Sequence, residues 1–286
     1  KKMKRIMLLL LVSITSQTAT FSQSKSTYDM QKSIESKTIV FIHGLFLNDK
    51  SWADWEAYFG QKGYTTYAPA YYEHQGMPSF LRRNAPERLG DLTFSEVLNQ
   101  MINFLQKLPE KPIIVGHSMG GLIAQKLVEL NLAEAAIIIS SAPPKGVITT
   151  KFSFLKSNSG MLNPLKGNSV FYPTKKWFHN AFTNTLTREQ SDRFFEQYVV
   201  PESRNIARET LKKAGKIDFK KPHVPMLFIS GKEDHIIPAS LNKKNFKKYK
   251  DEKSIKEHKI FDDRDHFIVG EENWSEVANY VNTWLN

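Results

Sequence analysis

The sequence contains no cysteine among its 286 residues. Disulfides, a thiolate nucleophile and cysteine-based metal sites are therefore excluded. No Walker or dinucleotide-binding glycine motif follows a predicted strand, and the histidines show no H-E-x-x-H spacing. No internal repeat of fixed period and no extended low-complexity tract is present. These absences predict a globular chain that works without a metal ion or a nucleotide cofactor.

Acidic residues are in the minority, since 29 Asp and Glu stand against 40 Lys and Arg, for a formal net charge of +11. The basic residues are scattered, and their densest cluster is a run of lysines between positions 243 and 250. One solvated helical face explains this cluster, with weak attraction to anionic surfaces as a side effect. We therefore expect no nucleic-acid partner.

Residues 1–24 differ from the rest of the sequence. Four basic residues within positions 1–5 precede an apolar run at 6–14, and a polar stretch follows at 15–24. This order is typical of a secretory signal peptide, because the run is too short to span a bilayer and is apolar on every face, unlike a buried amphipathic helix. We expect residues 1–22 to be removed near Ser22, lowering the net charge to about +7. The mature protein would then be exported to the periplasm or medium, without stable membrane insertion.

The remaining sequence alternates short β-like runs with longer amphipathic runs, the pattern of a parallel sheet covered by helices. Strands are predicted at 38–42, 64–68, 112–115, 135–140, 226–230 and 255–261. Helices are predicted at 51–61, 94–108, 122–130, 238–249 and 274–285, and residues 69–91 are predicted to form a loop. The fold class is therefore α/β, with a mostly parallel sheet of about six strands.

The alternation stops after the fourth predicted strand and resumes near residue 222. Residues 145–221 contain helix-like pieces near 176–183, 188–198 and 202–214 and many aromatic residues. We interpret this segment as a mainly helical cap, inserted into a core formed by residues 23–144 and 222–286. Its aromatic residues would form the core of the cap, line a pocket facing the sheet, or do both.

A nucleophile motif lies between the third predicted strand and the helix after it. Gly116-His117-Ser118-Met119-Gly120 has the G-x-S-x-G pattern. A serine at such a corner adopts a strained backbone conformation, and the flanking glycines avoid Cβ clashes in the tight turn. The hydroxyl would project at the carboxyl ends of the strands, where open α/β sheets bind ligands. Ser118 is thus the predicted nucleophile.

The order of motifs resembles the α/β-hydrolase superfamily, in particular lidded single-domain serine esterases and lipase-like hydrolases. The motifs are FIHG at 41–44, GHSMGG at 116–121, GKEDHIIP at 231–238 and DRDH at 263–266. The resemblance covers residues 39–285. It implies the α/β-hydrolase fold and a catalytic triad in the chain order serine, acid, histidine.

The resemblance places the acid after the fifth strand and the base after the last. Asp234 stands at the first place, with Glu233 as its nearest rival, and His266 stands at the second. A carboxylate there would orient the imidazole, and only histidine can take and return a proton near neutral pH. His258 and His235 do not fit the position of the base.

The same resemblance implies an oxyanion hole formed by two backbone N–H groups. One comes from the turn after His43-Gly44, at Leu45 or alternatively Phe46, and the other from Met119. Candidates for substrate contact are Phe46, His117 and Trp177. His117 could equally pack or hydrogen-bond locally.

The loop residues 73–75 could offer polar contacts near the site or remain solvated.

These features predict a hydrolase that cleaves carboxylic esters of small to medium hydrophobic substrates through an acyl-enzyme on Ser118. Fold and triad leave two alternatives open. The triad could act on thioesters, lactones or amides or transfer acyl groups, or the protein could be a small-molecule sensor with little turnover.

Overall fold

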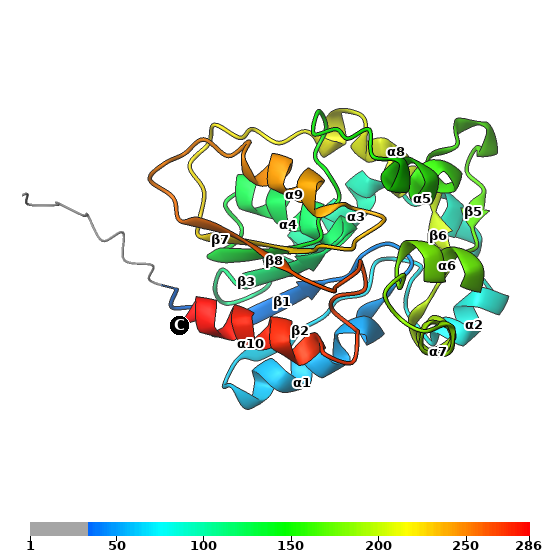
Figure 1. Cartoon of the computed structure of the whole chain (residues 1–286). Helices are drawn as coiled ribbons and strands as arrows, with labels where there is room; N and C mark the ends of the chain where they lie inside the picture. The colour runs from blue at the N-terminus through cyan, green and yellow to red at the C-terminus, as the bar shows by residue number, and fades with distance from the viewer. Residues whose placement is uncertain (1–33) are drawn as a thin grey trace, which may run out of the picture. The chain divides into compact units, whose positions relative to one another are not determined.

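A computed structural model describes residues 34–286, so the predicted signal peptide lies outside the described part of the chain. Its central feature is a parallel sheet in the order β2-β1-β3-β4-β7-β8 (Figure 1). The strands are β1 (Thr38–Ile42), β2 (Thr65–Tyr67), β3 (Ile113–His117), β4 (Ala135–Ile139), β7 (Met226–Gly231) and β8 (Lys256–Phe261). The predicted fold class and number of strands are confirmed, and all pairings in this sheet are parallel.

Helices cover both faces of the sheet. The helices α1 (Ala53–Gln61) and α10 (Trp274–Leu285) lie on one face, and α3 (Phe94–Leu105), α4 (Met119–Glu129) and α9 (Ala239–Phe246) lie on the other (Figure 1). No helix within residues 34–286 has the length and apolar character needed to cross a bilayer.

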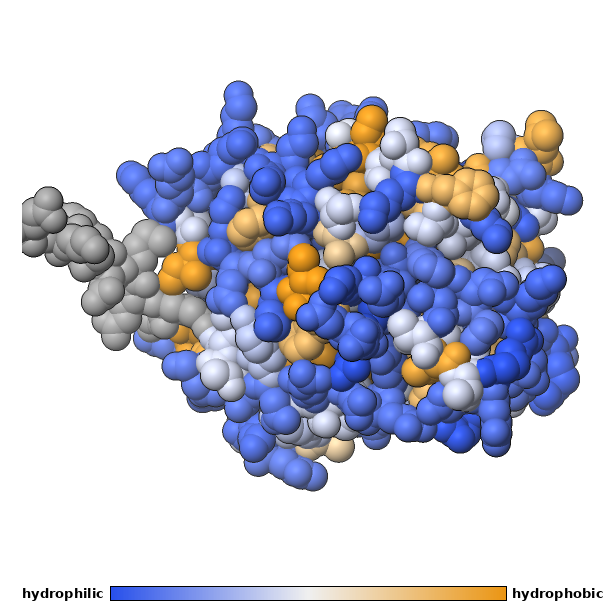
Figure 2. Space-filling view, in the orientation of Figure 1, coloured by the Kyte–Doolittle hydropathy of each residue, from blue (hydrophilic) through white to orange (hydrophobic). Residues whose placement is uncertain are grey.

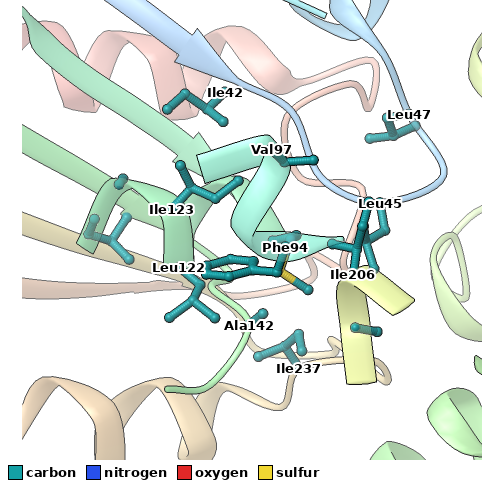
Figure 3. Close-up of a cluster of buried hydrophobic side chains, with 14 of the residues drawn as sticks. Ile42, Leu45, Leu47, Phe94, Val97, Leu122, Ile123, Ala142, Ile206 and Ile237 are labelled. Carbon is teal, nitrogen blue, oxygen red and sulfur yellow. The ribbon is translucent and has the colours of Figure 1, made fainter. Parts of the chain in front are cut away.

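Alternation along the central strands divides the apolar side chains between the two faces. In β1, Ile39 and Phe41 pack toward α1 and α10, whereas Val40 and Ile42 pack toward α3 and α4. The strands β3, β4 and β7 repeat this alternation. Figure 3 shows the apolar cluster on the face covered by α3 and α4. It extends from Ile42 past these two helices to the segment after β4. The four central strands β1, β3, β4 and β7 are therefore buried on both sides.

The segment between β4 and β7 forms the cap. It contains α5 (Phe152–Leu162), α6 (Lys175–Ala181), α7 (Arg188–Tyr198), α8 (Arg204–Thr210) and the short 3-10 helices η3 (Pro164–Lys166) and η4 (Lys213–Gly215). It also contains a two-stranded antiparallel sheet formed by β5 (Val170–Phe171) and β6 (Glu202–Ser203). The sequence pattern did not indicate α5 or this small sheet.

The prediction of a loop over residues 69–91 was wrong in part. This segment contains α2 (Pro78–Arg83) and the 3-10 helix η2 (Glu87–Asp91), and another 3-10 helix, η1 (Asp49–Trp52), precedes α1. The six residues of α2 are too few to show a helical period, and tertiary contacts stabilise them. Arg82 donates hydrogen bonds to Val199 O at 2.7 Å and Phe195 O at 3.0 Å.

The strand order reverses beside β1, because β2 lies on one side of it and β3 on the other. Ligands of open α/β sheets bind at the carboxyl ends of the strands at such a switch point. The loops that follow β1 and β3 meet there, and they carry Leu45 and Ser118.

Candidate active site

Ser118 lies in a strained turn between β3 and α4. Its φ of 54° and ψ of −117° are unusual for a residue with a side chain. A Cβ on Gly116 would overlap Gly120 O, and a Cβ on Gly120 would overlap Ile42 O. Both glycines of the motif are therefore required by close backbone packing, as the G-x-S-x-G pattern predicted.

Backbone hydrogen bonds hold this turn in place. Ser118 N–H donates to Ile139 O at 2.9 Å, and Ser118 O accepts from Gly121 N–H at 3.0 Å and Ala142 N–H at 2.8 Å. Strain at one residue of this kind costs about 1–3 kcal/mol and persists only when its surroundings fix it. The neighbouring strand β4 and the first turn of α4 provide that constraint.

The predicted acid and base are in contact. His266 Nδ1 lies 2.7 Å from Asp234 Oδ2, and both side chains are fully buried. Ile237 N–H donates to the other carboxylate oxygen at 2.7 Å. Glu233, the rival acid, is exposed, and its N–H donates to Arg264 O at 2.9 Å. The pairing of β7 with β8 thus brings the two loops together, and the carboxylate that contacts His266 is Asp234 and not Glu233.

The contact with Asp234 determines which ring nitrogen of His266 carries the hydrogen. A carboxylate accepts hydrogen bonds, so Nδ1 carries the hydrogen and the neutral ring has its lone pair on Nε2. Nε2 is buried and has no hydrogen-bond partner among the described residues. The ring lies nearly perpendicular to that of Phe182, with centroids 4.7 Å apart and planes at 87°. The imidazole is therefore oriented as a base requires.

The residue before His266 connects this loop to the cap. Asp265 is fully buried and accepts hydrogen bonds from Thr185 Oγ1 at 2.7 Å, Thr185 N at 3.1 Å and Phe267 N at 2.9 Å. Burial raises the pKa of Asp265, and burial together with the charge of Asp265 raises the pKa of Glu271 to about 8. We infer that Glu271 holds a proton at neutral pH while Asp265 remains the ionised acceptor. In the sequence, Asp265 stood out only as part of the DRDH motif at 263–266.

The N–H groups of the two predicted oxyanion donors are free of intramolecular hydrogen bonds in the described chain, whereas that of the alternative donor, Phe46, is not. A Cβ added to Gly44 would lie 2.7 Å from Ser118 Cβ, so the turn after β1 lies against Ser118. Phe46 N–H donates to Glu202 Oε2 at 3.2 Å and is therefore already engaged. Within residues 34–286, no intramolecular hydrogen bond engages the N–H of Leu45 or Met119. Met119 is the first residue of α4, where helix N–H groups lack acceptors.

The three candidates for substrate contact lie in different places. Phe46 lines the cavity that contains Ser118. Trp177 lies behind Phe46, with ring centroids 4.8 Å apart, and lines a separate outer cleft. His117 lines neither space, since it is fully buried and its Nε2 donates to His266 O at 2.8 Å. Burial and the neighbouring His266 hold the pKa of His117 well below its usual range, so it is a neutral structural group.

The cavity at Ser118 is small and mostly apolar. It has a volume of about 70 Å³ and lies between the sheet and the cap. Besides Ser118 and Phe46 it is lined by Leu45, Met119, Ala142, Pro143, Phe154, Asn158, Met161, Leu162, Phe182, Ala207, Thr210, Leu211, Ile236 and Ile237. A site of this size and polarity suits a short apolar group.

The helix α5 separates this cavity from a larger outer cleft. One face of α5 gives Phe154 to the cavity, and another gives Phe152 and Lys156 to a cleft of about 560 Å³ that excludes Ser118. Phe152 is 76% exposed. Figure 2 shows a mainly hydrophilic surface that apolar side chains interrupt above α5 and α8.

Comparison with known proteins agrees with this fold. No curated protein sequence is detectably similar to this chain. Among solved structures, a tomato methylketone synthase I variant complexed with beta-ketoheptanoate superposes with a TM-score of 0.67 at 19% identity, over 89% of this chain and 98% of that one. A monoacylglycerol lipase from Paleococcus ferrophilus has a TM-score of 0.64 at 20% identity, over 87% and 93% of the two chains. Polyneuridine aldehyde esterase has a TM-score of 0.63 at 17% identity, over 88% and 100%.

These likenesses establish the fold. The sequence model of the alpha/beta hydrolase family matches residues 39–280, which include every motif described above. The chain therefore belongs to the alpha/beta hydrolase family and is a hydrolase.

Proposed function

We propose that this hydrolase cleaves carboxylic esters with a short apolar acyl group, through an acyl-enzyme on Ser118. The observation that carries the proposal is the strained Ser118 at the strand-to-helix corner, beside a small apolar cavity. The buried pair of His266 and Asp234 supports it, because a neutral imidazole with a free Nε2 can accept the serine proton.

The proposed reaction has two halves. His266 Nε2 takes the proton of Ser118 while the serine oxygen attacks the ester carbonyl, and Asp234 stabilises the imidazolium. The oxyanion of the tetrahedral intermediate accepts hydrogen bonds from Leu45 N–H and Met119 N–H. The alcohol then leaves with the proton from His266. Water then gives a proton to His266 and attacks the acyl-enzyme. The bond between the acyl carbon and the serine oxygen breaks, His266 returns the proton to that oxygen, and the carboxylic acid is released.

The cavity supports a limit on acyl length. Its volume of about 70 Å³ lies well below the roughly 300–1,000 Å³ of sites that enclose drug-sized ligands. The side chains that close it on the cap side, Phe154 and Phe182, are bulky and apolar. We therefore expect acetate and butyrate esters to fit, and long acyl chains to require displacement of α5.

The test is a series of initial rates on p-nitrophenyl acetate, butyrate and octanoate, with the mature chain and its Ser118→Ala variant. We expect serine-dependent hydrolysis that is fastest for the short esters. Absence of turnover on every ester would contradict the proposal. Turnover of a thioester, lactone or anilide would then indicate the related chemistries, and saturable binding without turnover would indicate a sensor.

We also propose export of the protein, supported by the basic and apolar segments within residues 1–14. Expression of the full chain in a bacterial host, followed by fractionation and mass measurement, tests it. The mature protein should begin close to residue 23 and leave the cytoplasm. Full-length protein retained in the cytoplasm would contradict export.

A further inference from the structure

A buried carboxylate of the cap lies against the turn that carries the proposed oxyanion donor. Glu202, in β6, is fully buried and has three N–H groups around its carboxylate. Its Oε2 accepts from Phe46 N at 3.2 Å and faces His74 Nε2 at 3.1 Å, and its Oε1 accepts from Ser203 N at 2.6 Å. A buried carboxylate is costly unless it is paired and hydrogen-bonded, and this one is both.

The geometry of His74 identifies it as the positive partner of Glu202. Its Nδ1 lies 2.8 Å from Tyr72 O, a carbonyl that can only accept, so Nδ1 carries a hydrogen. Its Nε2 faces the carboxylate, so both ring nitrogens donate. Burial lowers the pKa of His74, but the charge and hydrogen bond of Glu202 outweigh burial and raise it.

The surroundings of His74 keep it in this position. Asn48 Nδ2 donates to His74 O at 3.1 Å and to Gly76 O at 2.9 Å. The ring of His43 is 5.7 Å away, and burial, followed by the charge of His74, lowers the pKa of His43 to about 3. His43 therefore stays neutral and does not compete for Glu202. Residues 73–75 were expected to offer polar contacts near the site or to remain solvated, and the buried His74 fits the first alternative.

The cap forms hydrogen bonds with both backbone polar groups of Phe46. Phe46 N–H donates to Glu202, and Phe46 O accepts from Val200 N–H at 2.8 Å. Phe46 has a φ of 69°, a conformation that residues with side chains rarely adopt and that needs support from its surroundings. These two contacts fix the peptide groups on both sides of Phe46, and the first of them directly follows Leu45, whose own N–H has no intramolecular acceptor in the described chain.

We propose that Glu202, paired with His74, is a positioning residue that fixes the turn at Leu45 and Phe46 so that Leu45 N–H points at the oxyanion. Glu202 does not touch the reacting atoms. It holds Phe46 N–H away from the substrate and leaves Leu45 as the donor on this side. The cap thus completes the catalytic site as well as covering it. This inference rests on the proposed ester hydrolysis.

The experiment compares Glu202→Gln with Glu209→Gln. Glu209 is a matched control, since it is also a cap carboxylate that accepts from the core, from Ser95 N at 2.9 Å and Ser95 Oγ at 2.8 Å, but its partner lies in α3 and not in the oxyanion turn. Both variants keep the shape of the side chain and remove its charge. Loss of an oxyanion donor typically lowers kcat about 100- to 1,000-fold. Because Leu45 N–H is displaced and not deleted, we expect kcat of Glu202→Gln to fall roughly 10- to 100-fold, with KM within about twofold.

A second readout separates positioning from general loss of structure. A trifluoromethyl ketone forms a tetrahedral adduct on the serine whose oxyanion occupies the same hole. Its affinity should fall in Glu202→Gln by the same factor as kcat/KM and stay unchanged in Glu209→Gln. If Glu202→Gln fails to fold, Glu202→Asp keeps the charge, shortens the reach, and should show the same parallel losses.

The outcomes distinguish this inference from the proposed function. If Glu202→Gln retains the kcat and inhibitor affinity of Glu209→Gln, Glu202 is not a positioning residue and the inference is overturned. A folded Glu202 variant whose KM rises while its kcat is unchanged would also overturn the inference. If the wild-type chain itself hydrolyses no ester, the proposed function fails first, whatever the variants do.

Discussion

The carboxyl edge of the sheet and the cap above it are built in different ways. At the sheet edge, backbone geometry holds the proposed catalytic groups: Ser118 by the turn between β3 and α4, and Asp234 and His266 by the adjacent ends of β7 and β8. The cap, by contrast, forms no strand pairing with the sheet in the described part of the chain, and side-chain carboxylates supply several of its contacts with the core. Glu202 and Glu209 of the cap accept N–H groups of the core, and Asp265 of the core accepts from Thr185 of the cap.

This difference has a physical reason. Parallel strands bring their carboxyl ends together whatever side chains they carry, so a site on that edge needs only short, well-shaped loops. An inserted segment shares no backbone ladder with the sheet and must be fixed by apolar packing and by directional polar contacts. Substitutions at the sheet edge should therefore act on the chemistry, and substitutions at the cap contacts should act on stability, alignment or substrate size.

The largest effect is expected from Asp234→Asn. The amide keeps the shape of the side chain but loses the charge that stabilises the imidazolium and favours the wrong tautomer of His266. In serine proteases the equivalent change lowers kcat by about 10⁴-fold, and we expect a loss of that order here. Steady-state kinetics on p-nitrophenyl acetate measure it, with Glu233→Gln as a control that retains activity. Equal activity of both variants would remove Asp234 from the mechanism.

Gly44→Ala should have the next largest effect. Its Cβ would lie 2.7 Å from Ser118 Cβ and would push the oxyanion turn away from the nucleophile. We expect kcat to fall at least roughly tenfold, as for a misplaced oxyanion donor.

Gly60→Ala is the matched control, because nothing lies within 4 Å of a Cβ there and Gly60 is within α1. That variant should keep full activity and gain up to about 1 kcal/mol of stability from its higher helix propensity. Unchanged kinetics in Gly44→Ala would refute the close approach of the two loops.

Thr185→Val tests a contact between cap and core. The substitution preserves the shape of the side chain but removes the hydroxyl that donates to Asp265 at 2.7 Å. A lost hydrogen bond to a buried charged group should lower the free energy of unfolding by about 1–3 kcal/mol. Urea denaturation measures this change. Val in place of the exposed Thr150 provides a control that should leave stability unchanged.

The pair of Asp265 and Glu271 predicts how stability depends on pH. Burial and the charge of Asp265 raise the pKa of Glu271 from 4.5 to about 8, so the folded protein binds a proton that the unfolded chain has released. This contribution is complete below the unfolded pKa and is lost as the pH rises through the folded pKa. The free energy of unfolding should therefore fall between about pH 5 and pH 8, by at most about 1.4 kcal/mol per pH unit. Glu271→Gln should flatten this dependence, and an unchanged slope would contradict the assignment of the proton.

The smallest effect is a shift in substrate size from changes on α5. Phe154→Ala enlarges the cavity at Ser118, and we expect the rate ratio of octanoate to acetate esters to rise severalfold, because one or two added methylenes are each worth about 1 kcal/mol in an apolar pocket. Phe152→Ala, on the exposed side of α5, should leave that ratio unchanged. Equal shifts in the two variants would mean that α5 moves as a whole and does not act as a wall.

The sequence itself determined the sheet and its reactive edge. Continuous apolar runs predicted the strands, and the glycines around Ser118 predicted the tight turn, because both signals are local. Chain order and the loops after the last strands indicated Asp234 and His266 for the same reason.

Only the tertiary structure decided how the cap meets that edge. In the structure, Phe46 N–H donates to Glu202, Trp177 lines the outer cleft, and His117 is buried away from both the cleft and the cavity at Ser118. Glu202 lies 156 residues from Phe46, and no period or motif links two such positions. Contacts of this kind arise from packing between distant segments, so they depend on the whole fold and leave no local pattern in the sequence.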